Sequence, residues 1–165
     1  MDKTQAVERV RSLIGRFRVA MMTTVDGGGV LRSRPMVVQD IDDDGNLWFF
    51  TSKSTEKVQD AIKDSRVSVA FVDERRELFV SLSGEAEIID DAEREHQLWT
   101  PELRAWFPDG VDAPDLVLVK VRVEHVEAWD SPKSTMVQVT RFVRAAVTGT
   151  PAWGGHHEVL DIPAP

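Results

Sequence analysis

The sequence predicts an α+β fold that is mainly β, an antiparallel barrel of about six strands with helices at its margins. The first observation is a series of short apolar segments that alternate with polar residues or are rich in β-branched and aromatic residues. The second is the set of glycine- and aspartate-rich turns that join these segments as hairpin turns do. The third is that helical spacing of apolar residues occurs only in short stretches. The length of 165 residues fits one domain.

The strands and helices follow one another along the chain with clear turn signals between most of them. Strands are expected at 17–25, 30–41, 47–51, 67–72, 78–89 and 116–129. Helices are expected at 4–14, from about 54 to 64, at 90–98 and at 136–147, with a short helical piece at 101–108. Gly84, inside a strand, predicts a bulge or a bend of the barrel. We expect residues 1–150 to form the domain and residues 151–165 a loose C-terminal tail.

Composition narrows the possible partners. The net charge of −8 disfavours nucleic acid as a partner, because an acidic surface repels a phosphate backbone. The chain has no cysteine, which excludes disulfides and thiolate metal sites. No apolar run is long enough to span a membrane, and the first residues do not resemble a signal peptide. We therefore expect a cytoplasmic protein with neither a membrane nor a nucleic-acid partner.

Two segments concentrate groups suited to phosphate. In the first, Arg32 and Arg34 point to one face of a strand, and Pro35 places this stretch at an edge or a bulge. Guanidinium matches phosphate well, but this segment taken alone favours solvated arginines on an edge strand.

In the second segment, a strand ends, hydroxyl residues follow, and a helix begins. The amides and dipole of a helix N-terminus favour an anion. Lys57 lies in the first helical turn, where a cation is unfavourable unless an anion is present. The simpler alternative is that Ser52 and Ser54 cap the helix.

Taken together and in order, these segments resemble the pyridoxamine-phosphate-oxidase-like flavin-binding split barrels, in particular their general stress protein 26 branch. The matching stretches are RSRPM at 32–36, LWFFTSKSTEKV at 47–58, RVSVAF at 66–71, VSLSGEAEIIDD at 80–91, VEAWDSPKS at 126–134 and FVRAAVTG at 142–149. The resemblance covers nearly the whole chain. It implies a six-stranded split β-barrel, a homodimer, and FMN held between the subunits.

The resemblance also implies a role for particular residues. Arg34 and Lys57 would hold the FMN phosphate, and Thr51 and Ser52 would donate hydrogen bonds to it. The backbone of Pro35, Met36 and Val37 would line the flavin ring, and Phe50 would lie beside it. Trp129 would approach the flavin from the partner chain, or simply pack in the core or interface. FAD, F420 or haem are alternative ligands for such a barrel.

The sequence departs from the true oxidase at several positions. Glu56 stands where the oxidase has a second basic residue, Phe79 stands where it has a glutamine, and the chain has no tyrosine for a substrate phosphate. Pyridoxamine phosphate is therefore not the expected substrate. We expect a flavin-dependent oxidoreductase with a small-molecule electron donor or acceptor and catalytic residues still to be named. The alternative is a non-catalytic flavin-binding stress protein.

The remaining motifs favour packing or solvent exposure over chemistry. The histidines lack metal-ligand spacing, so no metal site is expected, and His156 and His157 are expected in the solvated tail. Trp99, Trp106 and Trp153 are expected to pack in the core or at an interface.

Overall fold

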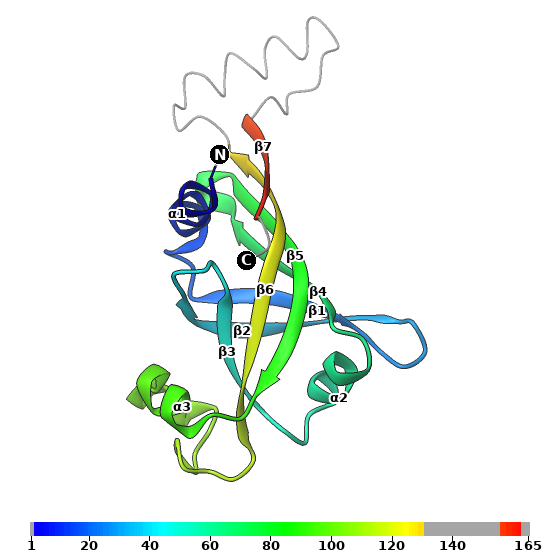
Figure 1. Ribbon diagram of the computed structural model, residues 1–165, viewed down its shortest axis with the longest axis vertical. Helices are drawn as coiled ribbons and strands as arrows, with labels where there is room; N and C mark the ends of the chain where they lie inside the picture. Colours follow the sequence, from blue (N-terminus) through cyan, green and yellow to red (C-terminus); the bar gives the residue numbers. More distant parts are fainter. Residues whose placement is uncertain (1, 131–155, 163–165) are drawn as a thin grey trace, which may run out of the picture.

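The protein is described by a computed structural model that covers residues 2–130 and 156–162. Six antiparallel strands follow one another in the order β3-β2-β1-β4-β5-β6, and pairing of β3 with β6 closes them into a barrel (Figure 1). The strands are β1 Val19–Val25, β2 Leu31–Ile41, β3 Leu47–Ser52, β4 Arg66–Asp73, β5 Leu78–Ile89 and β6 Leu116–Asp130. The predicted six-stranded split barrel of the α+β class is confirmed.

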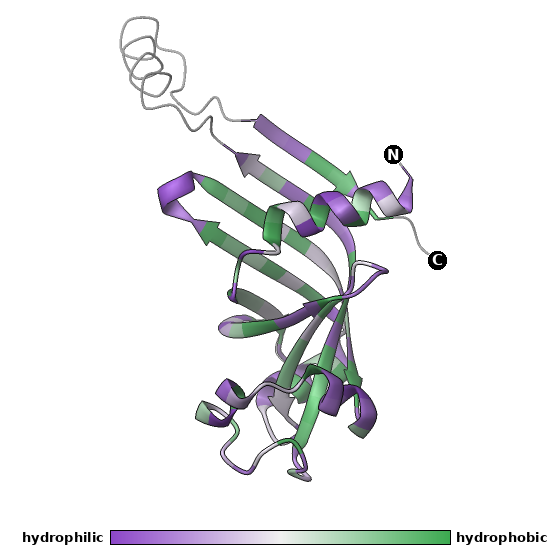
Figure 2. Ribbon diagram, turned by 90° about the vertical axis from the view of Figure 1, so that its left-hand side faces the viewer, coloured by the Kyte–Doolittle hydropathy of each residue, from purple (hydrophilic) through white to green (hydrophobic). Residues whose placement is uncertain are grey.

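Period-two patterning explains why these segments are strands. In β5, Leu78, Val80 and Leu82 are buried and alternate with less buried residues, so one face of the strand fills the barrel. The same alternation of hydrophobic and hydrophilic residues runs along the neighbouring strands (Figure 2). β3 differs, because its first five residues are all buried. It lies between the barrel interior and a second apolar cluster on its other side.

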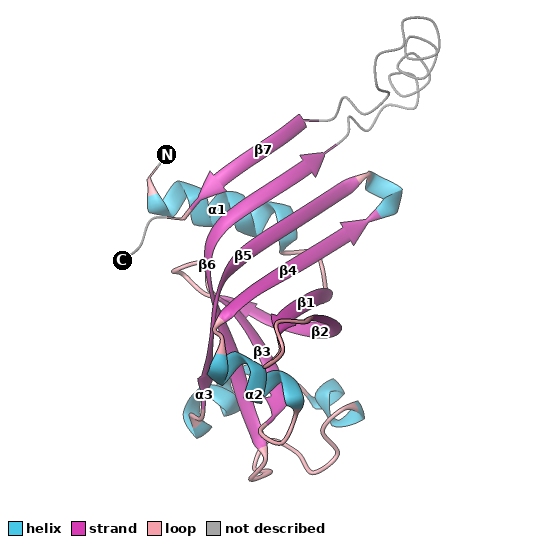
Figure 3. Ribbon diagram, turned by 90° about the vertical axis from the view of Figure 1, so that its right-hand side faces the viewer, coloured by secondary structure: helices cyan, strands magenta, loops and turns pink. Residues whose placement is uncertain are grey.

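The helices lie at the two ends of the barrel. α1, Lys3–Ile14, packs Val10, Leu13 and Ile14 into the main core, and α2, Glu56–Lys63, lies at the other end with α3, Ala92–Leu98 (Figure 3). Two short 3₁₀ segments, η1 Glu74–Arg76 and η2 Pro101–Ala105, connect elements. Within the described residues, none of the helices combines the length and the apolar composition that crossing a membrane requires.

The barrel is split between β2 and β3. These strands pair only at Val38, Asp40 and Ile41 of β2, with an irregularity after Val38. Beyond the Val38–Phe49 pair, β2 continues beside β1, whereas β3 continues beside β6 to the Ser52–Leu116 pair. The two strands therefore diverge, and residues 35–37 of β2 face residues 50–52 of β3 across a gap.

The predicted irregularity at Gly84 is also present. Ser83 lies opposite His125 and Gly84 lies opposite Val123, so Glu124 is an extra residue in β6. A Cβ atom at position 84 would lie 1.9 Å from the carbonyl oxygen of Arg122, which explains the glycine. The bulge divides β6 into a half that pairs with β3 and a half that pairs with a further strand.

That further strand corrects the expectation of a loose tail. Residues His156–Asp161 form β7, which pairs with β6 outside the barrel and places Leu160 in the core. His156 and His157 therefore lie on a strand rather than in a solvated loop. Trp153 and the helix predicted at 136–147 lie outside the described residues.

A second correction concerns the start of α2. Its N-cap is Thr55, and neither Ser52 nor Ser54 caps it. The Ser54 hydroxyl instead donates to Asp115, and the Thr55 hydroxyl donates to the Ser52 carbonyl at 2.8 Å. The start of α2 consequently has no side-chain cap.

Candidate functional site

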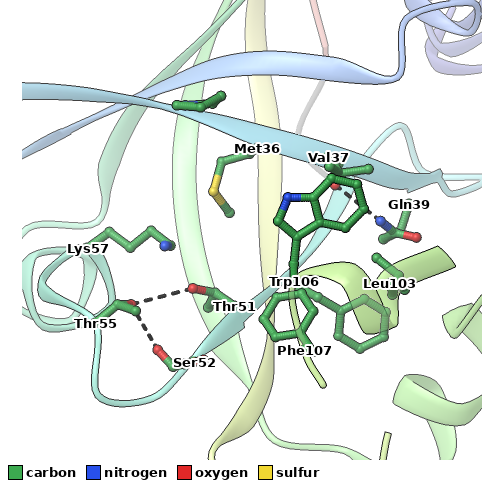
Figure 4. A pocket seen from close by; sticks show the side chains of 12 residues that line it. Met36, Val37, Gln39, Thr51, Ser52, Thr55, Lys57, Leu103, Trp106 and Phe107 are labelled. Carbon is green, nitrogen blue, oxygen red and sulfur yellow. Dashed lines mark hydrogen bonds between the residues drawn. The ribbon is translucent and has the colours of Figure 1, made fainter. Parts of the chain in front are cut away.

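A cavity of about 280 Å³ lies where the barrel splits. The diverging strands β2 and β3 form two of its walls, the start of α2 closes one end, and the segment that follows α3 closes the other (Figure 4). The lining residues are Pro35, Met36, Val37, Gln39, Phe50, Thr51, Ser52, Thr55, Lys57, Leu103, Trp106 and Phe107.

One end of the cavity is cationic. The half-buried Lys57 extends its ammonium group from α2 into the cavity (Figure 4). Burial, and then the nearby charge of Arg34, lower the pKa of Lys57 below its ordinary value of 10.5. Within the described part of the chain, neither Lys57 nor Arg34 forms an ion pair. Two neighbouring cations thus lie at this end, and in the described residues neither has a carboxylate within ion-pair distance.

Arg34 is held by a buried polar contact. Its guanidinium donates a 2.7 Å hydrogen bond to Oγ1 of Thr24, a fully buried residue on β1. The Thr24 hydroxyl in turn lies 3.5 Å from a carboxylate oxygen of the buried Asp60 on α2. Thr24 of β1 therefore anchors the arginine of β2, although Arg34 itself is not among the lining residues of the cavity.

Hydroxyl groups surround the cationic end. Thr51, Ser52 and Thr55 line the cavity, and the Thr51 and Thr55 hydroxyls lie 3.4 Å apart. They sit at the junction of β3 and α2, where the first amides of the helix have no side-chain cap. Hydroxyls, helix amides and two cations together are the groups with which proteins hold phosphate.

The β2 wall offers backbone groups. The Val38 amide donates to the Arg18 carbonyl, so alternation along the antiparallel ladder turns the Val37 amide away from β1 and toward the split. The same alternation turns the nitrogen of Pro35 away from β1, which explains why a proline is tolerated inside β2. Gln39 lies on this wall and donates to the Val37 carbonyl at 3.4 Å.

The end opposite Lys57 is aromatic. Phe107 packs against Phe50 with ring centroids 6.2 Å apart, and Trp99 meets Phe50 edge-on at 5.6 Å. Trp99 thus packs in a core cluster, as predicted. Trp106 does not, because it lines the cavity and remains 59 % exposed.

The structure brings most of the predicted site residues together. Around the cavity lie Pro35, Met36, Val37, Phe50, Thr51, Ser52 and Lys57. Arg34 lies beside Lys57, and its charge acts on the Lys57 ammonium. Trp129 does not reach this cavity within one chain. It lies near the end of β6 and stacks on His157 with centroids 5.1 Å apart.

Five lining residues were not predicted: Gln39, Thr55, Leu103, Trp106 and Phe107. Gln39 could have been found, because it lies two residues beyond Val37 on the same strand. Thr55 belongs to the run of hydroxyl residues already singled out. The segment that contains Trp106 gave no comparable signal, since adjacent aromatic residues near prolines fit a core as well as a site.

Titratable groups are scarce in the cavity. Among its described lining residues, Lys57 alone has a side chain that titrates, and burial and the nearby charge of Arg34 lower its pKa. No set of three or more histidine, aspartate or glutamate side chains in the described residues could hold a metal ion. The cavity can therefore bind and orient an anion with an extended apolar part.

The chain belongs to the family described as pyridoxamine 5′-phosphate oxidase like, whose sequence model matches residues 5–152. This match covers most of the chain and includes every residue of the cavity. The resemblance found in the sequence is thus confirmed at the level of the family.

Individual proteins that are similar to this chain are consistent with this family. The chain is 27 % identical over 158 residues to protein bli-3 of Neurospora crassa, a match that covers 90 % of this chain and 76 % of that protein. It is 25 % identical over 142 residues to general stress protein 26 of Bacillus subtilis, covering 84 % of this chain and 99 % of that protein. Among solved structures, a general stress FMN/FAD binding protein from Xanthomonas citri superposes with a TM-score of 0.65 at 30 % identity, covering 78 % of this chain and 90 % of that one.

Proposed function

We propose that the protein binds FMN in the split of the barrel, with the phosphate at the Arg34–Lys57 end. The observation that carries this proposal is the pair of neighbouring cations without a carboxylate partner at the end of a cavity. A phosphate group would neutralise them and would also accept hydrogen bonds from Thr51, Ser52 and the uncapped start of α2. The FMN/FAD binding protein from Xanthomonas citri, similar in fold and sequence, supports a flavin as the ligand.

The shape of the cavity supports a ring system beyond the phosphate. From Lys57 the cavity runs along Met36 and Val37 to Trp106 (Figure 4). The Val37 amide, turned toward the split, is suited to hydrogen bond with polar atoms at the edge of a flavin ring. Phe50 and Met36 offer the apolar surface that such a ring would cover.

We infer that the residues of this chain bind and orient the flavin. When bound, a flavin supplies hydride and electron transfer. Lys57 would neutralise phosphate charge, Arg34 would do the same from its anchored position on Thr24, and the strand walls would fix the ring. A flavin-dependent oxidoreductase with a small-molecule donor or acceptor is the function that this arrangement supports best.

We further propose that the site is shared in a homodimer. A volume of about 280 Å³ is at the lower end for a ligand pocket, as expected if a second subunit completes the walls. The sheet also has an apolar outer face beside the cavity, formed by Val19, Met21 and Val72, which are 51 %, 43 % and 63 % exposed. Val19 pairs with Val37 and Met21 with Pro35, so this face is continuous with the β2 wall of the cavity.

The same outer face extends to Trp129. Val72 lies opposite Phe79, and Phe79 lies opposite Trp129, so the three side chains share one side of the sheet. Since Trp129 is far along β6 from its own cavity, a twofold arrangement through this face would allow it to approach the cavity of the other subunit. Isologous packing of one face against itself is the commonest way in which such dimers form.

The proposal is tested by flavin titrations of matched variants. Arg34→Ala and Lys57→Ala should each weaken FMN binding about 10- to 100-fold, the effect of losing one charge-assisted hydrogen bond. Both should bind riboflavin, which lacks the phosphate, like the wild type. Arg32→Ala and Lys53→Ala are matched controls, because these cations are already paired with Asp26 and Asp90. Wild-type protein that binds neither FMN, FAD nor F420 would overturn the proposal.

A non-catalytic flavin carrier is the second candidate, favoured by the scarcity of titratable groups in the cavity. The two candidates differ in turnover. Rapid reduction of the bound flavin by NADH or NADPH, followed by reoxidation with an added acceptor over many cycles, identifies an oxidoreductase. Flavin that is bound tightly but is not reduced by either donor identifies a carrier.

A further inference from the structure

Trp106 is exposed although its backbone is firmly held. Its amide donates to the carbonyl of Leu103 at 3.0 Å, and the amide of Phe107 donates to the same carbonyl at 2.9 Å. Leu103 is 2 % exposed and anchors this turn in the second apolar cluster. The indole nevertheless remains 59 % exposed, and in the described residues its N–H has no hydrogen-bond partner.

The exposed indole is positioned to contact a ligand in the cavity. Trp106 and Lys57 approach the cavity from opposite ends, with Met36 on the wall between them and Val37 beside the indole (Figure 4). Behind Trp106, Phe107 packs on Phe50 and Phe50 packs on Trp99, so the aromatic end has a rigid base. A large aromatic side chain on a fixed turn, facing an open cavity, is suited to stack on a flat ring.

We propose that Trp106 is a specificity-determining residue, whose indole stacks on the ring of the ligand and selects aromatic monophosphates over phosphates that carry no ring. This inference rests on the proposed function, in that both place the phosphate at Lys57. It goes beyond that function by assigning the discrimination between ligands to a residue of the aromatic end. The cationic end alone would bind any small phosphate.

Leucine and phenylalanine at position 106 separate stacking from simple apolar contact. Trp106→Leu keeps an apolar side chain but removes the ring, and Trp106→Phe keeps a ring. We expect Trp106→Leu to bind FMN, riboflavin and AMP, in which a sugar separates the aromatic ring from the phosphate, about tenfold more weakly than the wild type, whereas Trp106→Phe stays within about threefold. Binding of inorganic phosphate should be the same in all three proteins, because phosphate does not reach the aromatic end.

Calorimetric titration of the full chain with these four ligands tests the proposal, with thermal unfolding without ligand as the folding control. Because the indole is largely exposed, both variants should unfold at the wild-type temperature. Unchanged binding of FMN and AMP by Trp106→Leu, or an equal loss of inorganic phosphate, would overturn the role of Trp106.

The ligand series also separates this inference from the proposed function. A wild-type protein that binds AMP in a Trp106-dependent manner but binds no flavin would overturn FMN as the ligand and leave the stacking role standing. A protein in which Arg34→Ala and Lys57→Ala weaken FMN binding while Trp106→Leu does not would leave the flavin site standing and overturn the stacking role. Wild-type protein that binds neither a flavin nor AMP would overturn both.

Discussion

The guanidinium of Arg34 lies close enough to the ammonium of Lys57 to lower the pKa of the lysine. Like charges are brought together here by two different elements, β2 and α2, and burial of Lys57 adds to the cost. A hydrogen bond to Thr24 anchors Arg34 despite this repulsion, and the Thr24 hydroxyl in turn lies 3.5 Å from Asp60. The negative charge of a bound phosphate would offset the repulsion between Arg34 and Lys57, so the electrostatic energy of this pair depends on the ligand.

The lowered pKa of Lys57 predicts how FMN binding depends on pH. Phosphate binding favours the charged lysine, so affinity should be full while Lys57 is protonated and should fall as pH rises through its lowered pKa. The fall should therefore begin below the ordinary lysine value of 10.5. Fluorescence titrations with FMN, from neutral to alkaline pH, measure it, and riboflavin corrects for titration of the ring that both ligands share.

Lys57→Arg is the matched variant for this prediction. A guanidinium stays charged over the whole range, so the variant should retain its FMN affinity at alkaline pH, relative to riboflavin. An alkaline loss of the same size in Lys57→Arg and the wild type would show that another group is responsible.

The local pattern of the sequence determined how much of this fold could be predicted. β5 was predicted with its true bounds, because the alternation from Leu78 to Ile88 is a local property of the chain. β7 was missed, because it is short and charged and its contacts are distant in sequence. It pairs with β6, and Arg9 of α1 binds Glu158 at 2.7 Å.

The candidate site was likewise predictable where its residues form a local pattern and not where it depends on contacts distant in sequence. Arg34, Thr51 and Lys57 lie in short segments whose residue types suggested phosphate binding, and these segments do meet at one end of the cavity. Trp106 reaches the other end only because the segment after α3 packs against β3 and β6, a long-range arrangement without a local signature. Side-chain type thus predicted the cationic end, whereas the aromatic end required the tertiary structure.

Gly84 is expected to be one of the least replaceable residues of the barrel. In Gly84→Ala the new Cβ would lie 1.9 Å from the Arg122 carbonyl oxygen and 2.9 Å from its carbon, and both are backbone atoms of the β5–β6 ladder. Relief requires the strands to separate, so the free energy of unfolding should fall by about 3 kcal/mol, the upper end of the usual range for overpacking. Urea denaturation measures this loss.

Gly27→Ala provides the control for that substitution. Gly27 has no positive φ, and the nearest atom to its added Cβ would be the Lys63 ammonium nitrogen at 4.0 Å. Its free energy of unfolding should change by no more than about 0.5 kcal/mol. Equal effects of the two substitutions would mean that the bulge tolerates a side chain.

The docking of β7 on β6 should depend on pH. Nδ1 of His125 lies 2.6 Å from Asp161 of β7, and this hydrogen bond raises the pKa of His125 above its ordinary value of 6.5. Its contribution to stability is complete below pH 6.5 and is lost as pH rises through the raised value. Glu127 has a lowered pKa because His157 and His125 hydrogen bond to it, so its contribution is complete above pH 4.5 and is lost in more acidic solution.

β7 should therefore be held most firmly between about pH 4.5 and 6.5. Amide hydrogen-exchange protection of residues 156–161 should decrease from pH 6 to pH 8.5 in the wild type and should change less in His125→Gln. His96→Gln is the control, because His96 pairs with Asp112 beyond α3, away from β7. Protection that varies equally with pH in His125→Gln and the wild type would contradict this role of His125.

The proposed homodimer predicts that one charge on the apolar outer face will separate the subunits. In Met21→Glu, a carboxylate would enter the interface beside Val19 and Val72 and would lose its hydration without gaining a partner. Light scattering should show a dimer for the wild type and a monomer for the variant, and FMN binding should weaken because the partner no longer completes the cavity. Ile62→Glu, on the exposed side of α2 at 64 % exposure, should remain a dimer. A monomeric wild type, or a Met21→Glu variant that stays dimeric, would rule out packing through this face, and the cavity would then have to bind its ligand with the walls of one chain alone.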